Sequence, residues 1–224
     1  MADGHGGDKT SSYVAQQLSD GLLDRILVAA NKTLNEALAL TFQDLNESTL
    51  ELSRKTLAHY ESGTTLSLAY IPDGEDSLHV GVIGDSPVIL AKKDGTFHRS
   101  PEHNARSNEA ERKAAEQRGG LFENGYLSSR SRDGMGIQMT RDIGCHTMRD
   151  VLLRYPDIYE LAVQNGDVLI LGSDGLLDPA HFSNDGDEQR IVKLVLDGAE
   201  AQDLINDALD RETGDNVSVI VYRH

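Results

Sequence analysis

The sequence has little cysteine and no long apolar run. Cys145 is the only cysteine in 224 residues, so an internal disulfide and a cysteine-based zinc cluster are both excluded and a reducing compartment is expected. No segment approaches the roughly 20 apolar residues of a membrane span, and the start lacks the basic-then-apolar pattern of a signal peptide. We therefore expect a soluble cytoplasmic protein, with a nuclear location as the alternative, and no membrane association.

Positive charge is also scarce. The 21 Lys and Arg residues are outnumbered by 37 Asp and Glu residues, which gives a formal net charge of −16. Such a balance argues against a nucleic-acid or anionic-membrane surface, and it is compatible with metal binding. Solubility explains most of the charge equally well.

Internal repeats and low-complexity tracts are absent, and the length fits a single domain, residues 1–224, with a continuous core. Apolar residues recur at helical spacing over Ser11–Ala30, where Gly21 predicts an interruption or bend. The spacing continues over Leu34–Leu57 and predicts two helices, or one long helix with a break near Asn46–Thr49. Each helix has one apolar face, with which we expect it to cover one side of a sheet.

The pattern then changes to one that is typical of strands. Thr64–Ile71 and Leu78–Ile83 are rich in residues that favour strands and are separated by a turn. Val88–Ala91 and Thr96–His98 flank an Asp-Gly dipeptide, which predicts a hairpin. The segment is expected to form an antiparallel meander.

The next stretch combines a polar helix with a segment that lacks any period. Asn108–Arg118 favours a helix, ends at two glycines and is expected to lie exposed. Glu123–Gly136 is rich in Ser, Gly and Arg and predicts a loop. This loop carries Arg130 and Arg132, and a flap that faces substrate and a simple linker are equally compatible with it.

The carboxyl-terminal part is predicted to contain two strands, then two helices and a last strand. Ile158–Val163 and Val168–Gly172 are predicted strands that form a hairpin at Asn165-Gly166-Asp167. Two helices and a final strand are then predicted at Ile191–Leu196, Ala199–Leu209 and Val217–Tyr222. Because the order of elements shows no repeating βαβ unit, we expect an α+β fold of antiparallel sheets with helices packed outside.

Asp3-Gly4-His5-Gly6-Gly7 is the first candidate for chemistry. Asp-Gly is mainly a turn signal, but here a carboxylate, an imidazole and three glycines lie together. They provide a hard oxygen ligand, a group for proton transfer and a backbone that can approach an ion or phosphate closely. Asp174 follows the apolar run Val168–Gly172, and Asp215 immediately precedes the final strand. Strand ends hold ligands precisely, so both are candidate metal ligands, with an ordinary turn role as the alternative.

Eight short motifs occur in the order found in the metal-dependent protein Ser/Thr phosphatases, also called type 2C protein phosphatases, and the chain resembles that family nearly from end to end. The motifs are Asp3-Gly4-His5-Gly6-Gly7, Ser62-Gly63-Thr64-Thr65, Gly84-Asp85-Ser86, Glu111-Arg112 with Gly119-Gly120, Thr140-Arg141 with Ile143-Gly144, Pro156-Asp157, Ser173-Asp174-Gly175 with Asp178, and Gly214-Asp215-Asn216.

The resemblance implies an α+β fold in which a two-sheet antiparallel β-sandwich is flanked by helix pairs, as four α-β-β-α layers. It also implies a centre of two Mn²⁺ or Mg²⁺ ions at one end of the sandwich. By this resemblance the Asp3 carboxylate bridges the ions, the Gly4 carbonyl binds one, and Asp174 with Asp215 binds the other. Hard oxygen ligands suit both ions, and paired ions would lower the pKa of a bridging water until it can attack phosphorus.

Further roles follow from the same resemblance. His5 would donate a proton to the departing Ser or Thr oxygen of a phosphoprotein substrate. Asp85 and Asp178 match positions that hold a weaker third metal ion in some members. Residues 106–132 would form a flap beside the active site. A monomer is expected.

Two departures from the family pattern favour alternatives. Members carry strands before the Asp-Gly-His motif that supply a phosphate-binding arginine and an acidic metal ligand, whereas only Met1 and Ala2 precede Asp3 here. We expect either a truncated sequence with an unpaired sheet edge or a degenerate phosphatase. Members also usually have Gly-Asp where this chain has Gly144-Cys145. The alternative function is a catalytically weak or inactive pseudophosphatase that acts as a binding or regulatory module. Structural Ca²⁺ binding is a third hypothesis, which the absence of EF-hand spacing disfavours.

Overall fold

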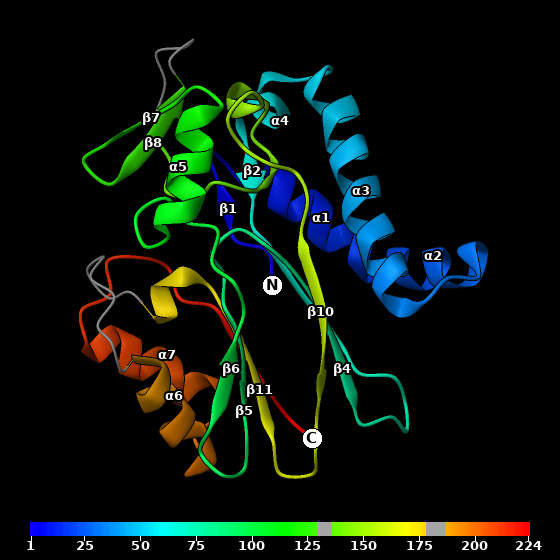
Figure 1. Ribbon diagram of the computed structural model, residues 1–224, viewed down its shortest axis with the longest axis vertical. Coiled ribbons are helices and arrows are strands. Elements are labelled where there is room, and N and C mark those ends of the chain that lie inside the picture. Colours follow the sequence, from blue (N-terminus) through cyan, green and yellow to red (C-terminus); the bar gives the residue numbers. More distant parts are fainter. Residues whose placement is uncertain (130–135, 178–186) are drawn as a thin grey trace.

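Two antiparallel β-sheets lie face to face, and helices cover both outer faces (Figure 1). The computed structural model describes residues 1–129, 136–177 and 187–224. The first sheet has the strand order β10 (Asp157–Ala162), β4 (Ser77–Ile83), β3 (Leu66–Tyr70). The second sheet has the order β12 (Val219–Arg223), β11 (Val168–Gly172), β5 (Val88–Ala91), β6 (Phe97–Arg99).

The core lies between the two sheets and on both of their outer faces. Alternate residues of β4 pack between the sheets against side chains of β5 and β11 in one cluster. The opposite face of β5 and β11 packs against α6 (Asp187–Leu196) and α7 (Ala201–Asp210), whereas the outer face of the first sheet packs against α1 (Lys9–Ser19) and α3 (Leu34–Ser53). Because side chains alternate across a strand, each sheet has two apolar faces to bury. The predicted α+β sandwich with outer helices is therefore confirmed.

The amino-terminal helices agree with prediction except at one break. Gly21 separates α1 from α2 (Leu22–Ala30), as the sequence predicts. The break predicted near Asn46–Thr49 is wrong, because α3 continues through it. The polar side chains there bond to helix carbonyls, with Asn46 Nδ2 donating to Phe42 O at 3.0 Å and Thr49 Oγ1 to Asn46 O at 3.0 Å. The helix ends at Ser53 instead, and the short α4 (Leu57–Glu61) follows.

The segment after α5 (Glu109–Gln117) corrects the loop prediction. Most of α5 lies at the surface, as expected, although Ala115 is buried. Residues 123–129 do not form an aperiodic loop, because β7 (Gly120–Glu123) and β8 (Tyr126–Ser129) make a hairpin. Asn124 and Gly125 have φ values of 52° and 87° in its turn, and Asn-Gly is a favoured pair for two residues with positive φ. Arg130 and Arg132 lie outside the described residues.

The predicted hairpin between the strands at 158–163 and 168–172 is also wrong. Both strands exist, but β10 pairs with β4 in the first sheet and β11 pairs with β5 and β12 in the second. The turn between them crosses from one sheet to the other. The buried Asp167 carboxylate holds that turn by accepting hydrogen bonds from Gln164 N at 2.9 Å and Lys93 N at 3.1 Å.

A small sheet of β1 (Gly4–His5), β2 (Gly63–Thr64) and β9 (Ile143–Gly144) brings three distant motifs together.

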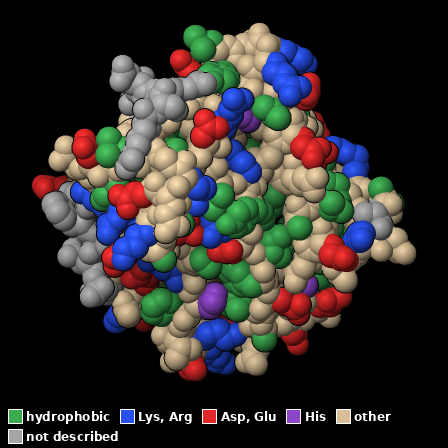
Figure 2. Space-filling model, turned by 45° about the horizontal axis from the view of Figure 1, so that its top comes forward, with side chains coloured by type: hydrophobic (Ala, Val, Ile, Leu, Met, Phe, Trp, Pro, Cys, Tyr) green, Lys and Arg blue, Asp and Glu red, His purple; other side chains and the backbone are tan. Residues whose placement is uncertain are grey.

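Figure 2 shows Asp and Glu side chains scattered among Lys and Arg side chains, so the net charge of −16 is not gathered into one patch on this face. In the described part of the chain, no helix combines the length and apolar character needed to cross a membrane.

Candidate functional site

Asp3 is held by the backbone of the strands next to it. Thr65 N donates to Asp3 O at 2.9 Å, and Asp3 N donates to Thr65 Oγ1 at 3.1 Å. Thr64 Oγ1 donates to the same Asp3 carbonyl at 2.9 Å. These bonds explain the two threonines of the Ser62-Gly63-Thr64-Thr65 motif. Gly4 follows in β1, where it pairs with Thr64, and a side chain at Gly4 would overlap the Ser11 side chain of α1.

Asp174 and Asp215 lie at the ends of paired strands, β11 and β12. Ser173 Oγ donates to Asn216 O at 3.0 Å and accepts from Ser218 N at 3.0 Å, which ties the two strand ends together. Asp174 begins a short 3₁₀ turn and accepts a hydrogen bond from Gly175 N at 2.8 Å. Asp215 is exposed, so this side of the cluster is open to solvent.

Asp85 contributes from the first sheet, just after β4. It is 4% exposed and accepts a hydrogen bond from Asn104 Nδ2 at 2.8 Å. The neighbouring Gly84 N donates to His103 Nδ1 at 3.1 Å, and His103 Nε2 contacts Asp157 Oδ2 at 2.9 Å. Asn104 and His103 are supporting residues that no sequence motif indicated.

The electrostatics show that Asp3, Asp85, Asp174 and Asp215 act on one another. Burial, followed by the charges of Asp85, Asp3 and Asp215, raises the pKa of Asp174 to about 8. Burial and the charge of Asp215 raise the pKa of Asp3, although a hydrogen bond with the Asp174 side chain lowers it in part. Burial is also the main reason that the pKa of Asp85 rises to about 6. Bringing these charges together is unfavourable without a cation, so the residues fit a divalent metal ion.

The carboxylates are spread more widely than the ligands of one tightly enclosed ion. Among the described residues, the group whose possible ligand atoms all lie within 4.8 Å of one another is His5, Asp142 and Cys145, and not the aspartate cluster. The wider spacing suits ions that keep several water ligands, or a pair of ions. Asp178 lies outside the described residues.

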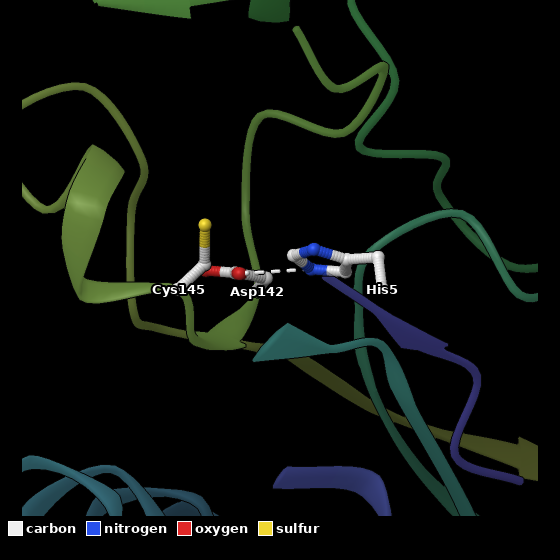
Figure 3. A group of neighbouring side chains, drawn as sticks. All are labelled: His5, Asp142 and Cys145. Carbon is white, nitrogen blue, oxygen red and sulfur yellow. Dashed lines mark ion pairs between the residues drawn. The ribbon is translucent and has the colours of Figure 1, made fainter. Parts of the chain in front are cut away.

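His5 lies beside the aspartates and contacts a carboxylate that the sequence did not single out. His5 Nε2 is 3.0 Å from Asp142 Oδ2, and Asp142 is fully buried. Figure 3 shows one ring nitrogen facing Asp142 and the other pointing away. Burial lowers the pKa of His5 to about 4, an effect that the charges of Asp85 and Asp3 partly oppose.

Cys145 stands where the family pattern has aspartate, and it is buried in apolar surroundings. Its sulfur points away from the His5–Asp142 contact in Figure 3, and the side chain packs in an apolar cluster with Ala115 and Leu127 of the 106–132 segment. Burial raises the pKa of its thiol. Cys145 is therefore a packing residue, and the nearby carboxylate comes from Asp142.

Arg154 fixes the segment that carries Asp142. Its guanidinium pairs with Asp142 Oδ1 and donates to the carbonyl oxygens of Asp142 and Cys145, each at 3.1 Å. Burial lowers the pKa of Arg154 to about 10. Nothing in the local sequence marks Asp142 or Arg154, because their partners are set by the three-stranded assembly of β1, β2 and β9.

Ion pairs connect the 106–132 segment to the sandwich. Glu111 of α5 pairs with Arg141 and accepts a hydrogen bond from Thr140 Oγ1 at 2.8 Å. Arg141 also contacts Asp157 Oδ1 at 3.3 Å, and its guanidinium lies 4.7 Å from the Tyr155 ring centroid. Three of the motifs noted in the sequence therefore meet in one structural network.

Gly63 is required for the His5–Asp142 contact. A Cβ at this position would overlap the Asp142 carboxylate and lie 2.6 Å from His5 Nε2. We predict that Gly63→Ala displaces the ring and lowers the free energy of unfolding by about 1–3 kcal/mol, which is typical of overpacking. Urea denaturation measures this change. Gly214→Ala is the matched control, because a Cβ there meets nothing within 4 Å, and equal stability of the two variants would contradict the steric explanation.

Comparisons with known proteins agree with this arrangement. The family model for protein phosphatase 2C matches residues 1–217. The chain is 29% identical to protein phosphatase 1L of Bos taurus over 99% of this chain and 62% of that protein. It is 28% identical to the probable protein phosphatase 2C 52 of Oryza sativa subsp. japonica over 99% of this chain and 43% of that protein. The chain thus spans about half the length of the curated relatives it matches.

Solved structures show the same fold at lower identity. A Caenorhabditis elegans sex determining protein superposes with a TM-score of 0.75 at 22% identity, covering 98% of this chain and 54% of that one. Serine-threonine phosphatase 2C from Toxoplasma gondii gives a TM-score of 0.72 at 18% identity, covering 98% of this chain and 82% of that one. Together with the family match, these findings show that the chain belongs to the protein phosphatase 2C family.

Proposed function

We propose that the chain is a metal-dependent protein phosphatase that hydrolyses phosphoserine and phosphothreonine in proteins, with Mn²⁺ or Mg²⁺ held by Asp3, Gly4, Asp174 and Asp215. The main observation in support is that Asp3, Asp174 and Asp215 converge from three strand ends. Burial, followed by the charges of Asp85, Asp3 and Asp215, raises the pKa of Asp174 there to about 8. Asp85 adds a carboxylate from the other sheet and is the candidate for a further, weaker ion. Such mutual repulsion is relieved when a cation binds.

The proposed function gives each of the candidate site residues a role. When bound, the ions would supply Lewis-acid stabilisation of the phosphate and activation of water. The aspartates orient those ions at the end of the sandwich, and the exposed side near Asp215 admits a bulky phosphoprotein. His5 is the candidate donor of a proton to the departing Ser or Thr oxygen, a group that leaves poorly unless it is protonated. Because its pKa is lowered to about 4, the small protonated fraction of His5 would carry this step.

Metal-dependent turnover tests the proposal directly. The purified chain should release phosphate from a phosphothreonine peptide in the presence of Mn²⁺ or Mg²⁺, and excess EDTA should abolish the release. Re-addition of Mn²⁺ should restore it, which separates metal removal from denaturation. Equal turnover in EDTA would contradict the proposal.

A non-catalytic binding module is the second candidate, favoured by Cys145 at a position where the family pattern has aspartate. Under this alternative, Mn²⁺ would still raise the melting temperature, because the carboxylates would still bind it. Phosphopeptides would bind without turnover. Titration of a phosphothreonine peptide, followed by phosphate analysis of the same sample, distinguishes the two candidates.

A further inference from the structure

Asp142 is a buried carboxylate that the proposed chemistry has not yet used. It is fully buried, and its Oδ2 lies 3.0 Å from His5 Nε2. Among the described residues, neither that nitrogen nor either carboxylate oxygen has an aligned hydrogen-bond partner, although Arg154 pairs with Oδ1 by charge. The contact with His5 therefore depends on proximity and charge, with Asp142 fully buried and the His5 side chain partly exposed.

Stability alone does not account for a carboxylate at this position. Removing two charges from water is unfavourable, and replacing a buried ion pair by apolar residues is often neutral or stabilising. The Asp142–Arg154 pair is therefore weak evidence of a structural role. Its distinctive feature is that the carboxylate meets His5, the candidate proton donor.

The backbone fixes this meeting from three sides. His5 lies in β1, where it pairs with Gly63 of β2, and Gly63 pairs in turn with Gly144 of β9. Asp142 immediately precedes β9. Because Gly63 has no side chain, the imidazole and the carboxylate come into contact directly above it.

Cys145 occupies a position where the family usually has an aspartate, and Asp142 supplies a carboxylate close to it. In the sequence, Gly144-Cys145 replaces the Gly-Asp usual in the family. The Cys145 sulfur and the Asp142 carboxylate each lie within 4.8 Å of a His5 ring nitrogen. Cysteine, histidine and a carboxylate are also possible zinc ligands. However, Arg154 already places a positive charge on Asp142 Oδ1, and the sulfur packs among apolar side chains, so a second metal site is not favoured.

We propose that Asp142 is the positioning residue of His5: its carboxylate, 3.0 Å from Nε2, holds the ring of the doubly protonated imidazole in place, so that the proton on Nδ1 passes to the departing substrate oxygen and the neutral ring keeps its proton on Nε2. The inference rests on the proposed phosphatase function. A carboxylate beside one ring nitrogen restricts the orientation of the imidazole and favours its protonated form. Asp142 does not touch the substrate and acts only through His5.

Two substrates with different leaving groups test this role. p-Nitrophenolate leaves readily without a proton, whereas the alkoxide of a phosphothreonine peptide needs one. Asp142→Ala and the isosteric Asp142→Asn should lower kcat/KM for the peptide about 10- to 100-fold more than for p-nitrophenyl phosphate. A merely structural role would lower both rates by the same factor, and that result would overturn the proposal, as would no loss for either substrate.

A double-mutant cycle with His5→Gln identifies the residue through which Asp142 acts. His5→Gln alone should change the ratio of peptide to p-nitrophenyl phosphate rates as Asp142→Ala does. Adding Asp142→Ala to His5→Gln should change the ratio no further, because residues that act as a unit are not additive. A further loss in the double variant would overturn the proposal.

A second variant separates a loss of folding from a loss of the proposed positioning role. Asp142→Ala/Arg154→Met removes both buried charges and keeps the test available if the single variant is unstable, and it should show the same selective loss of peptide turnover. Loss of both activities in equal proportion would count against positioning. If the wild-type chain hydrolysed neither substrate with Mn²⁺, the proposed function itself would fail, and this inference would fail with it.

Discussion

Asp174→Asn should make the metal-free protein more stable while removing its response to metal. In wild-type protein, burial and the charges of Asp85, Asp3 and Asp215 raise the pKa of Asp174 to about 8. A carboxyl whose pKa is raised on folding binds a proton more tightly in the folded state, so stability falls as the pH rises from the unfolded pKa to the folded one. Asparagine does not ionise, so the folded variant does not lose stability in this way as the pH rises.

The expected gain is on the order of 1–3 kcal/mol in EDTA at pH 8, because the raised pKa of Asp174 makes its ionised form unfavourable in the folded protein. For a chain of this length, 1 kcal/mol corresponds to roughly 2–4 °C in melting temperature. The gain should shrink toward pH 4, where the folded carboxyl is protonated and the unfolded one, with its ordinary pKa of 3.8, is also partly protonated. Differential scanning calorimetry in EDTA between pH 4 and pH 8 measures both trends.

When Mn²⁺ is added, Asp174→Asn should be less stable than the wild type instead of more stable. A site that binds only in the folded state stabilises the wild type by about 2.7 kcal/mol when the ion is at about 100 times its Kd. Asp174→Asn should lose most of that gain and reduce phosphopeptide turnover by at least about 100-fold, because the ions lose one ligand. Its activity and its stability in EDTA should therefore change in opposite directions.

Asp73→Asn is the matched control, because it makes the same chemical change in another Asp-Gly dipeptide. Asp73 is exposed, and a Cβ at Gly74 would meet nothing within 4 Å. This variant should melt as the wild type does, both in EDTA and in Mn²⁺. If Asp174→Asn lowered the stability in EDTA, the carboxylates would not repel one another, and the metal-site assignment would lose its electrostatic basis.

Local patterns made the aspartates candidates, and the order of the motifs, through the family resemblance, placed them in one predicted site. Asp174 follows a fully apolar strand and Asp215 precedes another, and a two-sheet arrangement brings such strand ends to one edge. The β7–β8 hairpin was missed although Asn124-Gly125 marked it, because the segment around it has no clear alternation. Local patterning therefore predicted most of the frame, whereas the assignment of the aspartates as metal ligands stays a prediction from the resemblance.

Strand partners and the residues around His5 could not be found in the same way. β10 and β11 have the pattern of a hairpin, yet they enter different sheets because each must bury its own apolar face. Asp142 lies between Thr140-Arg141 and Ile143-Gly144 of one motif but was not itself singled out, and it meets His5 only because β2 lies between their strands. Such contacts depend on long-range packing, to which a single sequence gives no direct guide.

Arg154→Met should produce the largest loss of stability among the changes considered. The substitution removes the partner of the buried Asp142 carboxylate together with two hydrogen bonds, to the carbonyl oxygens of Asp142 and Cys145. Breaking a buried ion pair on one side typically costs about 3–5 kcal/mol, because the remaining charge is left without compensation. For a chain of this length we expect the melting temperature to fall by about 6–20 °C.

Two companion variants separate the charge from the hydrogen bonds. Asp142→Ala/Arg154→Met removes the stranded carboxylate and should recover most of the loss, since neither charge then remains buried. Arg154→Lys keeps the positive charge but lacks the planar group that reaches both carbonyls, so it should fall between wild type and Arg154→Met. If the double variant were no more stable than Arg154→Met, the loss would come from the two carbonyl contacts and not from Asp142. The opposite result would make Arg154 the residue that allows a buried carboxylate to remain charged beside His5.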